Sequence, residues 1–181
     1  MILALVASLI VPLAQPAEAG PTFTDDNGNA HEGAIEQIAA RGVTKGCNPP
    51  ANDRYCPDRP VTRGEMAAFL QRAFDLDSGS RDHFKDDGGS PFESAINAVA
   101  RAGVTKGCNP PANDRYCPNA RVTRGEMAAF INRILDLDKG ADFFADDDDS
   151  VFEADINAIA RVGISKGCNP PGNDRFCANR N

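Results

Sequence analysis

Hydrophobic residues recur at helical spacing in two segments of a pattern that the chain repeats. In one segment, Phe92, Ile96 and Val99 fall on the same face of a helix. In a later segment, Met127 and Phe130 begin a second face of the same kind. Prolines, asparagines and aspartates, which favour turns, separate the two segments. The pattern therefore predicts a mainly α fold made of short helices joined by ordered loops.

The chain repeats itself with a period of about 60 residues. The segment Gly42–Pro50 returns unchanged at Gly103–Pro111, and with two substitutions at Gly163–Pro171. Such a period indicates a unit of helix, loop and helix that buries its apolar face against its neighbours. We expect repeats at residues 20–80, 81–140 and 141–181, the third of which lacks its second helix.

Capping boxes predict where the helices begin. In this motif a Ser, Thr or Asn side chain and a Glu three residues later satisfy amides that the first helical turn leaves unpaired. The second helices carry it at Thr62–Glu65 and Thr123–Glu126. The first helices carry it at Asn29–Glu32, Ser90–Glu93 and Ser150–Glu153. We therefore expect each first helix to be capped at the Asn or Ser.

Six cysteines occur as one pair per repeat, with eight residues between the members of each pair. In an exported chain an even, regularly spaced set favours disulfides, and the simplest pairing closes each loop locally. Zinc would need closer cysteine spacing or nearby histidines, and the two histidines do not recur in the repeats. We therefore expect no metal and no cofactor, and three disulfides: Cys47–Cys56, Cys108–Cys117 and Cys168–Cys177.

The N-terminus predicts export. An apolar run from Ile2 to Leu13 precedes Ala17-Glu18-Ala19, a form that signal peptidase cleaves, so residues 1–19 are expected to be a signal peptide. Such a run is too short for a permanent span, and no membrane partner is expected after cleavage. The net charge of −7 argues against a nucleic-acid partner, which requires a basic face. No histidine, serine or cysteine stands in a catalytic arrangement, so we do not expect an enzyme.

Several motifs agree in order and spacing with one known family. Each repeat opens with Phe-x-Asp, as in Phe23-Thr24-Asp25, and later contains Gly-Val/Ile-x-x-Gly. Between these motifs, repeats 1 and 2 carry the pairs Ala34-Ile35 and Ala95-Ile96. The second helices open with Thr62-Arg63-Gly64-Glu65 and Thr123-Arg124-Gly125-Glu126. This layout resembles the S-layer homology family, in a variety whose central loop is bounded by cysteines. The resemblance implies three repeats around a pseudo-threefold axis, with ligand grooves between neighbouring repeats.

The resemblance also implies a function and a site. Members of the family bind cell-wall polysaccharide without a covalent link and anchor proteins to the wall or S-layer, so we expect a secreted module of the cell wall or cell surface. Arg63 and Arg124 would pair with carboxylates of the glycan. Asp25, Asp86 and Asp146 are further candidates for the groove. Other interpretations stay open: the arginines could be solvated residues of the first helical turn, and the aspartates could bond nearby backbone amides.

Two other functions are compatible with the sequence. The chain could be a structural surface protein that assembles with copies of itself or with S-layer proteins, a neighbour supplying the helix that the third repeat lacks. It could also be a calcium-dependent adhesive module, since Asp146–Asp149 is a run of four acids. A run of like charges is more often a solvated loop, which favours wall binding over the calcium alternative.

Overall fold

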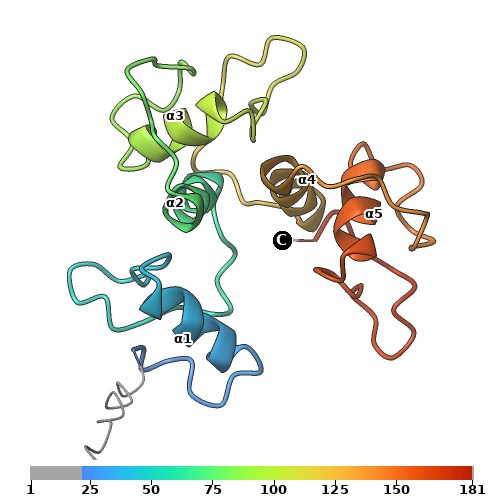
Figure 1. The fold of residues 1–181 in the computed structure, drawn as a ribbon. Coiled ribbons are helices and arrows are strands. Elements are labelled where there is room, and N and C mark those ends of the chain that lie inside the picture. Colours follow the sequence, from blue (N-terminus) through green and yellow to red (C-terminus); the bar gives the residue numbers. More distant parts are fainter. Residues whose placement is uncertain (1–21, 181) are drawn as a thin grey trace, which may run out of the picture.

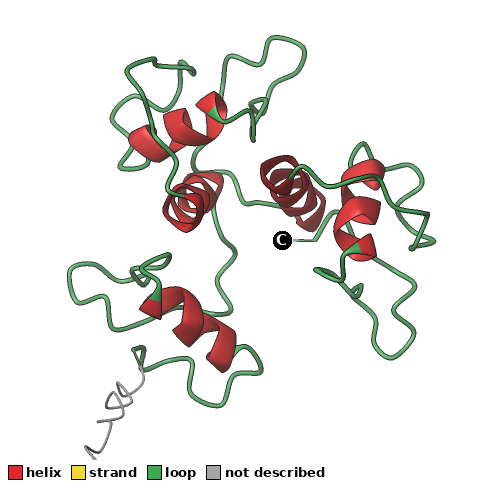
Figure 2. Cartoon of the chain, in the orientation of Figure 1, coloured by secondary structure: helices red, strands yellow, loops and turns green. Residues whose placement is uncertain are grey.

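The structure, a computed structural model, describes residues 22–180. In that range it contains helices and no strands, which confirms the prediction of a mainly α fold (Figure 2). The predicted signal peptide lies outside the described residues. No described helix has the length and apolar character that are needed to cross a membrane. The helices are α1 (Glu32–Ala40), α2 (Arg63–Phe74), α3 (Glu93–Arg101), α4 (Arg124–Leu135) and α5 (Glu153–Arg161).

The helices pair across the boundaries between repeats. The second helix of repeat 1, α2, packs against α3, and the second helix of repeat 2, α4, packs against α5 (Figure 1). The first helix of the chain, α1, packs against no other described helix. The three units surround a common centre, where the N-termini of α2 and α4 meet and Val122 N donates a hydrogen bond to Val61 O at 3.0 Å. Each complete pair is thus built from two successive repeats.

The hydrophobic core follows this pairing. Ile96 and Val99 of α3 are buried beneath α2, and Ile156 and Ile159 of α5 are buried beneath α4. In α1, which lacks such a cover, Ile35 is the buried residue. Because hydrophobic stabilisation follows the apolar area removed from water, the first unit has the weakest helical core.

The second helices begin as the sequence predicts, whereas the first helices do not. Thr62 and Thr123 are N-caps with complete capping boxes. The predicted caps at Asn29, Ser90 and Ser150 are wrong, because α1, α3 and α5 begin at the Glu of each motif, with no side-chain cap. The Asn and Ser side chains instead close a turn before the helix. Ser90 Oγ, for example, accepts a hydrogen bond from Phe92 N at 3.2 Å.

Disulfides, and glycines whose backbone lies in the left-handed region, fix the conformation of the loops between the helices. The three disulfides are those predicted, so each loop is closed within its own repeat. Gly42, Gly103 and Gly163 follow the first helices with φ of +70°, +73° and +76°, a region that favours glycine. The loops therefore keep one shape from repeat to repeat and can form equivalent surfaces.

Candidate functional site

Two equivalent grooves lie between successive repeats. Groove 1 lies between the loop of repeat 1, one face of α2 and the start of repeat 2, and has a volume of about 800 Å³. Groove 2 is the counterpart one repeat later, between the next loop, α4 and the start of repeat 3, and its volume is about 300 Å³. Corresponding residues line the two grooves, among them Lys45 and Lys106, Phe69 and Phe130, and Arg72 and Arg133.

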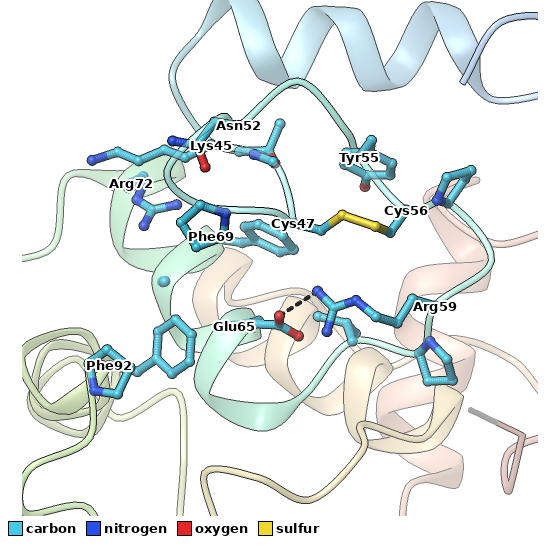
Figure 3. A pocket seen from close by; sticks show the side chains of 18 of the residues that line it. Lys45, Cys47, Asn52, Tyr55, Cys56, Arg59, Glu65, Phe69, Arg72 and Phe92 are labelled. Carbon is cyan, nitrogen blue, oxygen red and sulfur yellow. Dashed lines mark hydrogen bonds and ion pairs between the residues drawn. A yellow bond between two sulfur atoms is a disulfide. The ribbon is translucent and has the colours of Figure 1, made fainter. Parts of the chain in front are cut away.

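Aromatic and cationic side chains converge on groove 1. Figure 3 shows Tyr55, Phe69 and Phe92 around the hollow, with Lys45 and Arg72 at its edge. The groove also contains an ion pair in which Arg59 donates to Glu65 at 2.6 Å. Burial opposes ionisation of Glu65, but the hydrogen bonds from Arg59 and Thr62 outweigh it and lower the pKa of that carboxyl. The groove thus offers flat apolar faces beside positive charge.

Arg63 lies at the inner end of groove 2 and is not a solvated residue of the first helical turn. Its side chain crosses from repeat 1 into repeat 2, where Nε donates to Tyr116 O at 2.8 Å. Nη1 forms an ion pair with Glu126 at 2.7 Å. The guanidinium lies 4.9 Å from the centre of the Tyr116 ring and 5.3 Å from that of Phe130. Only 3% of Arg63 is exposed, so its charge is held inside the protein.

Arg124 repeats this arrangement one repeat later with fewer partners. Nε donates to Phe176 O at 2.9 Å, and the guanidinium lies 4.7 Å from the centre of the Phe176 ring. Burial lowers the pKa of Arg124, and the nearby charge of Arg180 adds to the effect. Arg124 lines a separate hollow of about 270 Å³ together with Ile131 and Ile164. The two arginines therefore serve different hollows.

The three candidate aspartates bind the loops of their own repeats. Asp86 Oδ1 accepts from Tyr116 N at 2.7 Å and Oδ2 accepts from Cys117 N at 3.0 Å, and Asp25 and Asp146 make the same two bonds. Burial opposes ionisation of Asp25, but these amide bonds and the charge of Arg54 outweigh it and lower its pKa. The three aspartates thus accept hydrogen bonds from backbone amides, which was the alternative to a role in the groove. Asp146 in addition lines a hollow with Ser150, Phe152 and Arg180.

A second set of acids directly follows these aspartates: Asp26, Asp87 and Asp147. The sequence did not single out Asp26 and Asp87, and Asp147 was considered only as a member of the acidic run Asp146–Asp149. The residues of this set are fully buried, and their carboxylate oxygens have no hydrogen-bond partner in the described part of the chain. Burial raises the pKa of Asp147 to about 6, and the nearby negative charge of Asp142 adds to this effect. The oxygens of Asp142, Asp147 and Asp148 lie within 4.8 Å of one another, as a cation site would require. The doublet that follows Phe-x in every repeat was the available signal: Asp25-Asp26, Asp86-Asp87 and Asp146-Asp147.

Comparison with known proteins places these features in a family. The model of the S-layer homology domain matches residues 22–67 and 83–128. The chain is 27% identical to the Surface-layer 125 kDa protein of Lysinibacillus sphaericus, over 91% of this chain and 13% of that protein. It is 30% identical to an amylopullulanase of Thermoanaerobacterium thermosulfurigenes, over 81% of this chain and 8% of the enzyme. A cell surface protein of Thermoanaerobacter kivui is 27% identical over 64% of this chain and 16% of that protein.

The chain spans less than a fifth of the length of each of these relatives. The matching part is the repeat region, with its Phe-x-Asp openings and its Thr-Arg-Gly-Glu second helices. On the match of the family model to two of its repeats, the chain belongs to the S-layer homology domain family.

Proposed function

We propose that this chain is a secreted, non-catalytic module that binds an acidic cell-wall polysaccharide and so anchors protein to the wall or the S-layer. Its family membership and its similarity to a surface-layer protein and a cell surface protein favour a role at the cell surface. The similarity to amylopullulanase covers 8% of that enzyme, and the proposal carries none of its activity over to this chain.

The composition of the two grooves is the observation that carries the proposal. Phe69 and Phe92 in groove 1 offer apolar ring faces on which a sugar ring can stack. Lys45 and Arg72 stand beside them and can pair with carboxylates on the glycan. Groove 2 repeats the combination, although the chain as a whole carries a net charge of −7. A positive groove on an acidic protein selects for an anionic ligand.

The arginines and aspartates take different parts in this proposal. Arg63 lines groove 2, where the ion pair with Glu126 offsets its charge. Arg124 has no acidic partner within residues 22–180 and supplies positive charge in the hollow beside Phe176. In this proposal Asp146 accepts a hydrogen bond from a sugar hydroxyl, a role supported by its position in the lining of a hollow. Asp25 and Asp86 act on the ligand through the loops that their backbone hydrogen bonds hold in position.

Two exposed lysines allow a test that does not disturb the fold. Lys45 and Lys106 line the two grooves, whereas Lys139 is exposed outside them. The double variant Lys45→Ala/Lys106→Ala should bind purified wall polysaccharide roughly fivefold more weakly in calorimetry, since each exposed ion pair contributes modestly. Lys139→Ala serves as the matched control and should bind like wild type. Equal affinity of the double variant and the control would refute the groove assignment.

A further inference from the structure

Three carboxylates converge at the start of repeat 3, and we call their residues, Asp142, Asp147 and Asp148, the acidic cluster. Asp147 and Asp148 belong to the loop that precedes α5, and Asp142 lies in the segment that leads from α4 to Phe144. One oxygen of each carboxylate lies within 4.8 Å of an oxygen of the other two. Three like charges at such distances repel one another, so the arrangement costs free energy unless a positive charge offsets it.

Asp147 is the buried member of the acidic cluster. Its side chain is fully buried, whereas Asp142 and Asp148 are exposed. Neither carboxylate oxygen of Asp147 has a hydrogen-bond partner in residues 22–180. Burying a carboxylate with neither a hydrogen bond nor a counterion is strongly unfavourable. A buried, unpartnered carboxylate beside two others therefore indicates a positively charged ligand.

The side chains of the described residues do not supply this positive charge. None of the ion pairs within residues 22–180 includes a member of the acidic cluster. Asp146, by contrast, accepts hydrogen bonds from two backbone amides and pairs with Arg175 at 3.7 Å. Burial raises the pKa of Asp147, and the charges of Asp142 and Glu153 raise it further. The cluster thus carries negative charge that the cations of the described chain leave uncompensated.

Calcium is the cation whose chemistry matches the acidic cluster. It binds oxygen ligands at about 2.3–2.6 Å, so two ligands on opposite sides of one ion lie about 4.6–5.2 Å apart. The three oxygens of the cluster can therefore share a single calcium ion. Magnesium requires a stricter octahedron at about 2.0–2.1 Å and gives up its water reluctantly, so a partly exposed set of carboxylates suits it less. The cluster contains neither histidine nor cysteine, the ligands that favour zinc.

The acidic cluster is most complete in repeat 3. Asp87 of repeat 2 is buried and unpartnered in the same way as Asp147. The position of Asp148, however, is occupied by Asn27 in repeat 1 and by Gly88 in repeat 2. Calcium affinity depends on the number of charged ligands. Repeat 3 should therefore hold calcium more tightly than the other two repeats.

We propose that the acidic cluster of repeat 3 is a calcium site. Asp147 binds the ion from the protein interior, Asp142 and Asp148 bind it from the surface, and water completes the coordination. A run of acids such as Asp146–Asp149 is by itself typical of a solvated loop. The burial of Asp147, and the approach of Asp142 from outside the run, distinguish the cluster from such a loop. The ion fastens the segment before Phe144 to the loop before α5, a role that does not depend on polysaccharide binding.

Calcium titration of the full, disulfide-bonded chain tests the site. After a chelator has removed bound metal, calorimetry should show saturable binding with a Kd of about 0.1–1 mM, the range of extracellular calcium modules. Saturating CaCl2 should raise the melting temperature, because the ion binds the folded state. An equal concentration of MgCl2 should raise it less. No saturable binding of calcium, or an equal rise with both salts, would overturn the proposal.

Asparagine substitutions test whether the ion binds at the acidic cluster. Asp142→Asn and Asp148→Asn each remove an exposed carboxylate and should weaken calcium binding about tenfold. Asp87→Asn is the matched control, because it removes the equivalent buried carboxylate from repeat 2 and should leave the Kd unchanged. Equal weakening by Asp87→Asn and Asp148→Asn would refute the assignment to repeat 3.

Asp147→Asn separates the loss of the ion from damage to the fold. In chelator this variant should melt at a higher temperature than the wild type, because a buried and unpaired charge is removed. Saturating calcium should raise the melting temperature of the wild type and change that of the variant little. A variant that gains as much from calcium as the wild type would show that Asp147 does not bind the ion, and the proposed site would be wrong.

Discussion

Replacing Arg63 by alanine should destabilise the protein, because this side chain joins repeat 1 to repeat 2. The substitution removes the bond from Nε to Tyr116 O and the ion pair with Glu126, together with the stacking on Tyr116 and Phe130. It also leaves the carboxylate of Glu126 without its partner across the boundary.

The magnitude follows from these contacts. A hydrogen bond that involves a charged group contributes about 1.5–3 kcal/mol, and breaking a buried ion pair from one side costs about 3–5 kcal/mol. The Glu126 side chain is 24% exposed, so water partly compensates its loss and the lower values apply. We expect Arg63→Ala to lower the free energy of unfolding by about 3–4 kcal/mol. Arg124→Ala should cost about 2 kcal/mol, because Arg124 has no acidic partner in residues 22–180.

Urea unfolding of the two variants and the wild type, followed by circular dichroism with the disulfides intact, measures this difference. The free energy of unfolding should be lower for Arg63→Ala than for Arg124→Ala. The value for Arg63→Lys should lie between those of Arg63→Ala and the wild type. A loss below about 1 kcal/mol for Arg63→Ala would contradict the reasoning, since an exposed arginine would give that result.

Three further predictions concern stability. Burial raises the pKa of Asp147 from 3.8 to about 6, so the folded protein favours the uncharged carboxyl. The stability that depends on this uncharged form is complete below about pH 4 and is lost as the pH rises through 6. In metal-free buffer, Asp147→Asn should therefore raise the melting temperature at pH 7 and flatten its pH dependence between 4 and 6; an unchanged pH profile would contradict the assignment. Serine at both Cys108 and Cys117 should cost about 2–3 kcal/mol by urea unfolding, since the loop that they close is short. Gly64→Ala should cost about 1–3 kcal/mol in the same assay, because its Cβ would lie 2.5 Å from a ring carbon of Phe92; no loss would show that the ring can move away.

Features that depend on neighbouring residues could be predicted from the sequence. The disulfides follow from cysteines nine positions apart, and the starts of α2 and α4 follow from Thr and Glu within one helical turn. The start of α3 was placed too early, because a serine followed by Glu three residues later can close a turn as well as cap a helix. Local spacing alone does not separate the two.

The partners of the arginines could not be predicted, because they are distant in the sequence. Arg63 meets Tyr116 and Glu126 at separations of 53 and 63 residues, across a repeat boundary. The Thr-Arg-Gly-Glu motif identifies Arg63 as a candidate functional residue, but it does not show that the side chain is buried. The pairing of α2 with α3 is non-local in the same way, because it is made by two successive repeats rather than within one.

Retention on cell walls tests the central claim most directly. The exported form expected from the sequence, residues 20–181, would be mixed with purified sacculi that carry their polysaccharide and with sacculi from which it has been stripped. We predict retention on the intact walls alone, reduced by Lys45→Ala/Lys106→Ala and unaffected by Lys139→Ala. Equal retention on stripped walls, or no retention on either, would contradict polysaccharide binding as the function of this chain.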